Sequence, residues 1–127
     1  MAKNSKKILL VEDEELLRGV YYDILTDEGF QVDTAEEGIS ALEKITTGTY
    51  DLILLDIILP NKDGLQVLRQ LKIHPPKNSN LNIVLMTNLA EESLVTDTRQ
   101  YNIRDIINKS QLTPDTYLAK VKTYLTS

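Results

Sequence analysis

Residues 52–56 read Leu-Ile-Leu-Leu-Asp, four consecutive apolar side chains followed by a carboxylate. The run is short and does not alternate between apolar and polar residues, which indicates a strand covered on both faces. Residues 8–13 have the same form, Ile-Leu-Leu-Val-Glu-Asp. Because strands buried on both faces are typical of parallel sheets flanked by helices, these two stretches predict an α/β fold.

The same pattern extends outward along the chain in five strand and helix units. The predicted strands are residues 7–12, 30–34, 52–56, 82–87 and 105–108. Stretches with apolar side chains at helical spacing follow each strand, at residues 16–25, 39–45, 65–71, 91–101 and 114–125. The fourth of these has the thinnest apolar face, so we expect that helix to be the least firmly anchored. Thr113 and Pro114 are typical of the first residues of a helix.

Composition limits the classes of protein that this chain resembles. At 127 residues, with 42% hydrophobic and 26% charged residues, it has the size and composition of one folded domain. We expect residues 1–127 to form a single domain, with 1–6 as a flexible tail. The chain lacks cysteine, a long apolar run and a secretory signal, which favours a soluble cytoplasmic protein. Its net charge of −5 argues against direct nucleic-acid binding.

Polar side chains stand at the ends of four predicted strands. Glu12 and Asp13 follow the first strand, Asp56 ends the third, Thr87 ends the fourth and Lys109 follows the fifth. In open α/β sheets, ligands bind beyond the carboxyl ends of the strands. We therefore expect these five side chains to meet in one site.

This set of side chains is suited to phosphoryl transfer. Clustered carboxylates repel one another, and a hard divalent cation such as Mg²⁺ relieves that repulsion. An aspartate carboxylate is also a known nucleophile toward phosphorus. A lysine ammonium and a threonine hydroxyl complete the groups that neutralise charge on phosphoryl oxygens.

Five motifs in this order resemble the receiver family of two-component response regulators: residues 8–14, residues 54–60, Asp63-Gly64, Thr87 and Lys109. The resemblance covers the chain from Ile8 to Leu125. It implies a flavodoxin-like fold, a five-stranded parallel sheet of order 2-1-3-4-5 with helices on both faces.

The resemblance also implies a role for each residue of the site. Asp56 matches the phosphoacceptor, Thr87 the switch hydroxyl and Lys109 the phosphate-binding lysine. The implied Mg²⁺ ligands are Glu12, Asp13, Asp56 and the backbone carbonyl of Ile58. The chain is then expected to accept a phosphoryl group without being a turnover enzyme.

The implied partners are proteins. A histidine kinase or a histidine phosphotransfer protein is expected to supply the phosphoryl group, and an unidentified protein to receive the signal. The implied switching face consists of the fourth helix, the fifth strand and the fifth helix. A phosphorylation-dependent dimer is left open, and no membrane insertion is expected.

Three positions depart from the family pattern. Ser110 follows Lys109 where the family usually has a proline after a cis peptide bond. Whether the Lys109–Ser110 peptide bond is cis is therefore left open. Ile106 occupies the switch position, where the family usually has Tyr or Phe. Asn88 stands where the residue is usually Ala or Gly, and we expect it to narrow the approach to Asp56.

Three alternative functions are compatible with parts of the pattern. An interaction-only pseudo-receiver would keep the fold without phosphoryl turnover. The three departures favour it slightly, whereas the intact Asp56, Asp13, Thr87 and Lys109 oppose it. A flavoprotein of the same fold needs a phosphate-binding loop, which the acidic residues 12–15 would oppose. A phosphatase with an aspartate nucleophile would have a second acid at the position of Ile58.

Overall fold

The computed structural model of the chain describes residues 6–77, 81–88, 98 and 100–126. Its five strands form one parallel sheet in the order β2-β1-β3-β4-β5, which confirms the predicted topology. The strands are β1 (Lys7–Val11), β2 (Gln31–Ala35), β3 (Leu52–Asp56), β4 (Ile83–Thr87) and β5 (Asp105–Asn108). Three strands differ from the prediction by one residue: β1 ends before Glu12, β2 is shifted by one residue, and β4 begins at Ile83.

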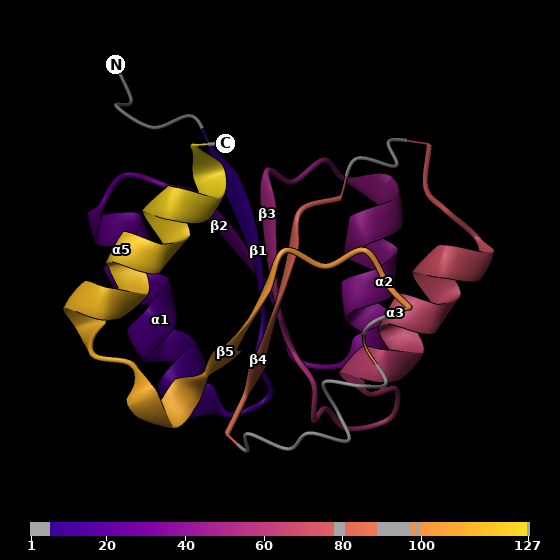
Figure 1. Ribbon diagram of the computed structural model, residues 1–127, viewed down its shortest axis with the longest axis horizontal. Helices are drawn as coiled ribbons and strands as arrows, with labels where there is room; N and C mark the ends of the chain where they lie inside the picture. The colour runs from indigo at the N-terminus through magenta and orange to yellow at the C-terminus, as the bar shows by residue number, and fades with distance from the viewer. Residues whose placement is uncertain (1–5, 78–80, 89–97, 99, 127) are drawn as a thin grey trace.

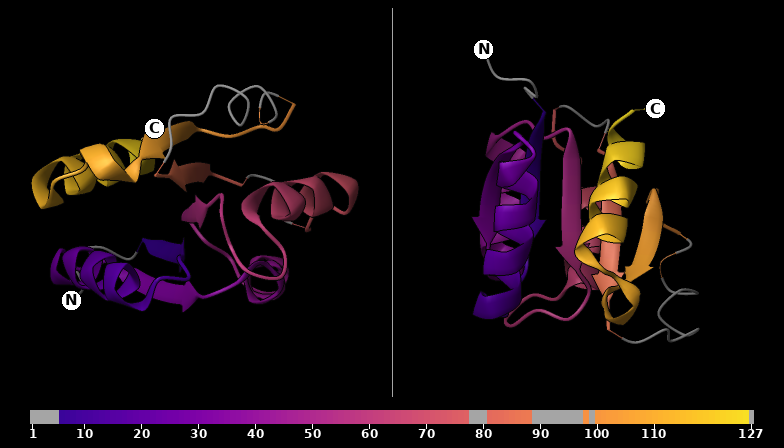
Figure 2. Two further views of the ribbon diagram at one scale, coloured as in Figure 1. Left: turned by 90° about the horizontal axis from the view of Figure 1, so that it is seen from below. Right: turned by 90° about the vertical axis from the view of Figure 1, so that its left-hand side faces the viewer.

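Helices cover both faces of the sheet (Figure 1 and Figure 2). On one face lie α1 (Glu15–Asp27) and α5 (Pro114–Leu125), and on the other lie α2 (Gly38–Thr47) and α3 (Gly64–Ile73). A short 3₁₀ turn, η1 (Lys109–Gln111), joins β5 to α5. Most of the predicted fourth helix at 91–101 and of the predicted tail lies outside the described residues.

The continuous apolar runs supply two separate cores, one on each face. In β1, Leu9 and Val11 belong to the core beneath α2 and α3, whereas Ile8 and Leu10 belong to the core beneath α1 and α5. All four side chains are fully buried. Successive side chains of a strand point to opposite faces, so a strand between two helical layers must be apolar at every position.

The helices begin and end near the residues that the sequence indicates. Gly29 follows α1 with φ 99°, a left-handed conformation that glycine adopts without strain. Thr113 caps α5 by accepting a hydrogen bond from the Thr116 backbone N–H, and Pro114 is the first residue of that helix, as predicted. In the described part of the chain, no helix combines the length and apolarity needed to cross a membrane.

Candidate functional site

The predicted site residues lie together at the carboxyl edge of the sheet. Val11, the last residue of β1, pairs with Leu55, so Glu12 and Asp56 follow side by side. Asp56 pairs with Met86, and Thr87 pairs with Asn108, which precedes Lys109. The parallel register therefore brings together residues that are up to 97 positions apart in the sequence.

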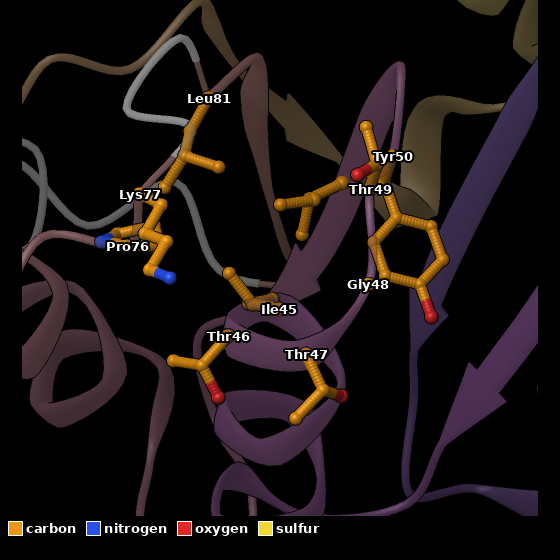
Figure 3. A pocket seen from close by; sticks show the side chains of 10 residues that line it. Ile45, Thr46, Thr47, Gly48, Thr49, Tyr50, Pro76, Lys77 and Leu81 are labelled. Carbon is orange, nitrogen blue, oxygen red and sulfur yellow. The ribbon is translucent and has the colours of Figure 1, made fainter.

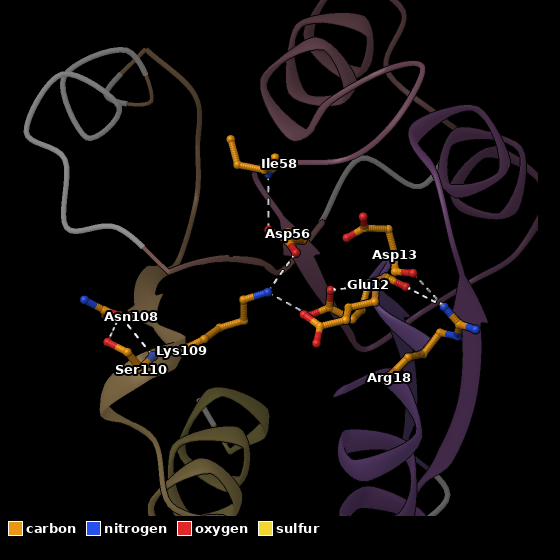
Figure 4. A network of polar contacts seen from close by, with 9 residues as sticks. Glu12, Asp13, Arg18, Asp56, Ile58, Asn108, Lys109 and Ser110 are labelled. Carbon is orange, nitrogen blue, oxygen red and sulfur yellow. Dashed lines mark hydrogen bonds and ion pairs between the residues drawn. The ribbon is translucent and has the colours of Figure 1, made fainter. Parts of the chain in front are cut away.

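Lys109 joins the two buried carboxylates (Figure 4). Its Nζ lies 2.8 Å from Oε1 of Glu12 and 2.8 Å from Oδ2 of Asp56. The exposed fractions of these residues are 8% for Lys109, 0% for Glu12 and 4% for Asp56. Burial alone would lower the pKa of Lys109, but the hydrogen bonds to Asp56 and Glu12 outweigh it and raise this pKa. The lysine therefore stays charged and offsets the repulsion between the carboxylates.

Glu12 is held by a second donor on its other oxygen. Its Oε2 accepts a hydrogen bond of 3.2 Å from the backbone N–H of Glu14, at the start of α1. Burial raises the pKa of Glu12, and the hydrogen bond from Lys109 opposes this shift. Both carboxylate oxygens of Glu12 therefore have hydrogen-bond partners.

Three carboxylates of the site are close enough to share a cation. Glu12, Asp13 and Asp56 each offer an oxygen, and these oxygens lie within 4.8 Å of one another. Asp13 is exposed, whereas the other two are buried, so the cluster opens to solvent on the Asp13 side. Oxygen-only donors that keep one open side suit Mg²⁺, which retains several waters when it binds to protein.

The loop after β3 is closed tightly against Asp56. The Ile58 backbone N–H donates to Oδ1 of Asp56 at 3.2 Å, and the Gly64 N–H donates to the Ile57 carbonyl at 2.8 Å. A Cβ on Gly64 would lie 2.6 Å from the Asp56 carbonyl oxygen, so this close approach requires glycine. Asp63 then caps α3 through the Gln66 backbone N–H. The predicted turn residues Asp63 and Gly64 thus shape the loop that follows Asp56.

The two predicted switch residues lie on β4 and β5. Thr87 ends β4 and is buried, one residue beyond the partner of Asp56. Ile106 is half-buried and packs against the core beneath α2 and α3. Asn88, which follows Thr87, is exposed.

The turn that carries Lys109 is built without proline. The Asn108 side-chain oxygen accepts from the Ser110 backbone N–H at 3.0 Å and from the Ser110 hydroxyl at 2.7 Å. In the described part of the chain every peptide bond is trans, including the one between Lys109 and Ser110. Asn108 and Ser110 therefore hold the short η1 turn from which Lys109 reaches the carboxylates.

Arg18 is a site neighbour that the sequence reasoning missed. Its Nη1 donates to the backbone carbonyls of Glu12 at 3.0 Å and Asp13 at 3.3 Å. Its Nη2 lies 3.1 Å from Oε1 of Glu36, just beyond β2. An arginine five residues after an acidic pair, in the first turn of a helix, is the signal that was available in the sequence.

A separate cavity of about 330 Å³ lies at the opposite end of the sheet (Figure 3). Three threonines, Thr46, Thr47 and Thr49, line it with Tyr50, Lys77 and apolar neighbours. Among the described residues that line this cavity there is no carboxylate. The groups suited to metal and phosphoryl chemistry are therefore at the carboxyl edge and not in this cavity.

Comparisons with known proteins agree with this geometry. The sequence model of the family described as response regulator receiver domain matches residues 8–122. The chemotaxis protein CheY of Bacillus subtilis is 33% identical over 104 residues, which are 81% of this chain and 84% of that protein.

Two solved structures with magnesium share the fold. The response regulator TrrA of Thermotoga maritima, in complex with Mg²⁺ and BeF, superposes with a TM-score of 0.79 at 32% identity, covering 94% of this chain and 99% of that one. The receiver domain of the sensor histidine kinase PA1611 of Pseudomonas aeruginosa, with a magnesium ion in its active-site cleft, has a TM-score of 0.85 at 25% identity and coverages of 98% and 100%.

Other curated relatives are much longer than the matched region. The match covers 12% of the transcription factor prr1 of Schizosaccharomyces pombe and 30% of the transcriptional regulatory protein DltR of Streptococcus agalactiae. The similarity to these proteins therefore concerns one part of each of them.

Proposed function

Because the chain belongs to the response regulator receiver domain family, we propose that it accepts a phosphoryl group on Asp56 in a magnesium-dependent reaction. The observation that supports this most is the Asp56 carboxylate, which is buried, held by Lys109 Nζ at 2.8 Å and close to two further carboxylates. A buried carboxylate that contacts a lysine ammonium on one side and lies near an exposed carboxylate on the other is suited to receive a phosphoryl group.

The proposed donor is a phosphohistidine of a histidine kinase or a phosphotransfer protein. A carboxylate oxygen of Asp56 forms a bond to phosphorus while the bond from phosphorus to the histidine nitrogen breaks. The electron pair of the broken bond returns to the imidazole ring, which takes up a proton from solvent. The product on this chain is an acyl phosphate.

Side chains of the site position and neutralise the phosphoryl group. Lys109 is already oriented toward Asp56 and needs only a small displacement to contact a phosphoryl oxygen. The Ile58 backbone N–H fixes the carboxylate that acts as nucleophile.

The donor set fits Mg²⁺, with Glu12, Asp13, Asp56 and the Ile58 carbonyl as its proposed ligands. When bound, the ion would neutralise charge on the phosphoryl oxygens.

Phosphorylation is proposed to act on the face that includes β5 and α5. Thr87 ends the strand beside Asp56 and is the proposed lever, with Ile106 on the neighbouring strand as the switch position. Ile106 lacks an aromatic ring, so we expect the motion there to be smaller than an inward turn of Tyr or Phe. The downstream partner is proposed to be a protein, and the chain is proposed to work in the cytoplasm, where histidine kinases present their phosphohistidine.

We propose that the chain is an acceptor and not a turnover enzyme, since Asp56 itself becomes the product. The test is intact-mass measurement after incubation with acetyl phosphate, with Mg²⁺ or with EDTA. We expect one phosphoryl group with Mg²⁺ and none for Asp56→Asn, while Asp115→Asn at the start of α5 behaves like the wild type. Unmodified wild-type protein that also fails to bind Mg²⁺ would favour the interaction-only alternative.

A further inference from the structure

The turn between β2 and α2, together with the first residue of α2 (residues 36–38), contacts the loop after β1 and the loop after β3. Val11, the last residue of β1, pairs with Ala35, the last residue of β2, so the segments that follow these two parallel strands begin side by side. The Glu12 backbone N–H also donates to the Ala35 carbonyl at 3.0 Å. The turn is therefore placed by the sheet at the edge of the carboxylate cluster.

The first contact runs through Arg18. Its guanidinium holds the carbonyls of Glu12 and Asp13 with one nitrogen and Glu36 with the other. The Arg18 side chain is 16% exposed and that of Glu36 is 71% exposed. An ion pair with one partner so exposed adds little stability, so the consequence of this bridge is geometric. It fixes the backbone from which the Asp13 carboxylate projects.

The second contact runs to the loop that carries Ile58. The Asn61 side-chain N–H donates to the Glu37 carboxylate, and Asn61 has φ 66°, a conformation that most residues avoid. Next to it, a Cβ on Gly38 would lie 1.8 Å from the Lys62 carbonyl oxygen. The turn and the loop are thus in contact through backbone atoms as well as through this hydrogen bond.

We infer that residues 36–38 are a positioning element for the metal: they set the spacing between the Asp13 carboxylate and the Ile58 carbonyl. The inference rests on the proposed function, in which these two groups bind Mg²⁺ from opposite loops. Mg²⁺ requires short bonds in a near-octahedral arrangement, whereas Ca²⁺ accepts longer and less regular ones. Fixing both loops to one turn therefore favours Mg²⁺ over Ca²⁺. Partners that orient metal ligands typically contribute 10–100-fold to metal affinity.

The test measures metal affinity and apo stability separately. Mg²⁺ and Ca²⁺ are titrated into the full chain while the amide NMR signals of Asp13 and Ile58 are followed, and thermal melts are recorded in EDTA. Arg18→Met breaks the first contact. Asn61→Gly breaks the second and keeps the positive φ available. We expect each to weaken Mg²⁺ binding about 10-fold, and Ca²⁺ binding clearly less.

A rescue and a control complete the design. In the double variant Asn61→Asp with Glu37→Gln, the hydrogen bond is reversed and the net charge of the wild type is kept, so we expect near-wild-type Mg²⁺ affinity. Lys122→Met breaks the exposed Lys122–Glu28 ion pair between α5 and the end of α1, and should leave both affinities unchanged.

Two results would overturn the inference in distinguishable ways. Variants that melt earlier in EDTA but keep the wild-type Mg²⁺ affinity and the wild-type preference for Mg²⁺ over Ca²⁺ would show that the turn has a structural role only. A wild-type chain that does not bind Mg²⁺ at all would overturn the proposed function, and the positioning role with it.

Discussion

At the scale of single residues, Lys109 determines the charge balance of the site. Its ammonium contacts two carboxylates that are both almost fully buried. A buried ion pair adds modest net stability because both partners lose hydration, but removal of one partner leaves an uncompensated buried charge. The site is therefore sensitive to the loss of this one side chain.

We expect Lys109→Met to destabilise the metal-free protein by about 3–5 kcal/mol near pH 8, because it leaves two unpaired buried carboxylates. Urea unfolding in EDTA measures the loss. The deficit should shrink near pH 5. Burial already raises the pKa of Glu12, and losing the opposing hydrogen bond from Lys109 raises it further. A carboxyl group whose pKa is higher in the folded than in the unfolded state stabilises the folded state at low pH. This contribution is lost as the pH rises through the folded-state pKa.

Lys122→Met is the matched control for this experiment, since the Lys122–Glu28 pair is exposed and should change stability by less than about 1 kcal/mol at either pH. If Lys109→Met lowers the free energy of unfolding equally at both pH values, unpaired carboxylates are not the cause of the lost stability.

At the scale of elements, two helical glycines have opposite environments. Gly38 begins α2 with the Lys62 carbonyl where a Cβ would be placed. At Gly19, within α1, no atom of the described residues lies within 4 Å of that position, apart from its neighbours along the helix. The same substitution should therefore have opposite effects at the two sites.

We expect Gly38→Ala to destabilise the protein by more than about 1 kcal/mol, because the β2–α2 turn must move away from the loop after β3. Gly19→Ala should instead stabilise it by about 0.5–1 kcal/mol through helix propensity. Chemical unfolding of both variants checks the pair. A stabilising Gly38→Ala would contradict the close approach between turn and loop.

The same elements show how much of the fold and of the site could be predicted from the sequence. The strands were predictable because continuous apolar runs such as 52–55 require burial on both faces, and their polar ends indicated Glu12, Asp13, Asp56, Thr87 and Lys109. The turn at 36–38 was missed because its role depends on contacts between loops that no local pattern encodes, whereas Arg18 had a local signal, its position five residues after Asp13, that was not used. Asn108 was missed because the family pattern directs attention to a proline after the lysine. In this chain Ser110 follows Lys109, and the Ser110 hydroxyl donates a hydrogen bond to the Asn108 side chain.

At the scale of the whole molecule, the site edge carries exposed apolar side chains next to its carboxylates. Leu16, in the first turn of α1, is 75% exposed, and Ile58 is 63% exposed. Ile73, at the far end of α3, is similarly exposed at 60%. Exposed apolar side chains beside a reactive group are suited to contact with a donor protein.

We expect Leu16→Ser to slow phosphoryl transfer from a protein donor several-fold, with no change in phosphorylation by acetyl phosphate, since the small donor does not contact α1. The protein donor is the phosphorylated histidine kinase that transfers fastest to the wild type in a panel of purified kinases. Ile73→Ser is the matched control and should transfer at the wild-type rate. Equal slowing by both variants would indicate a general effect of apolar loss.

The path from Asp56 to the proposed output face crosses two neighbouring strands. Asp56 pairs with Met86 on β4, and the next residue, Thr87, pairs with Asn108 on β5. Thr87 is buried, so a displacement of its hydroxyl toward a phosphoryl group changes the packing beside β5. Ile106 lies on that strand, where Leu85 is its partner on β4.

Thr87→Ala should still accept a phosphoryl group on Asp56, because the nucleophile and Lys109 are unchanged, but it should lose most of the coupled change in β5. Amide NMR with and without a beryllofluoride phosphoryl mimic compares the wild type and the variant across Asp105–Asn108, and Thr113→Ala at the N-cap of α5 is the control for loss of a threonine. Loss of the shifts in Thr87→Ala but not in Thr113→Ala would make Thr87 the lever, because a ligand shifts a conformation only through contacts that differ between the two states. Full wild-type shifts in Thr87→Ala would instead place the coupling in the β3–α3 loop, beside Ile58.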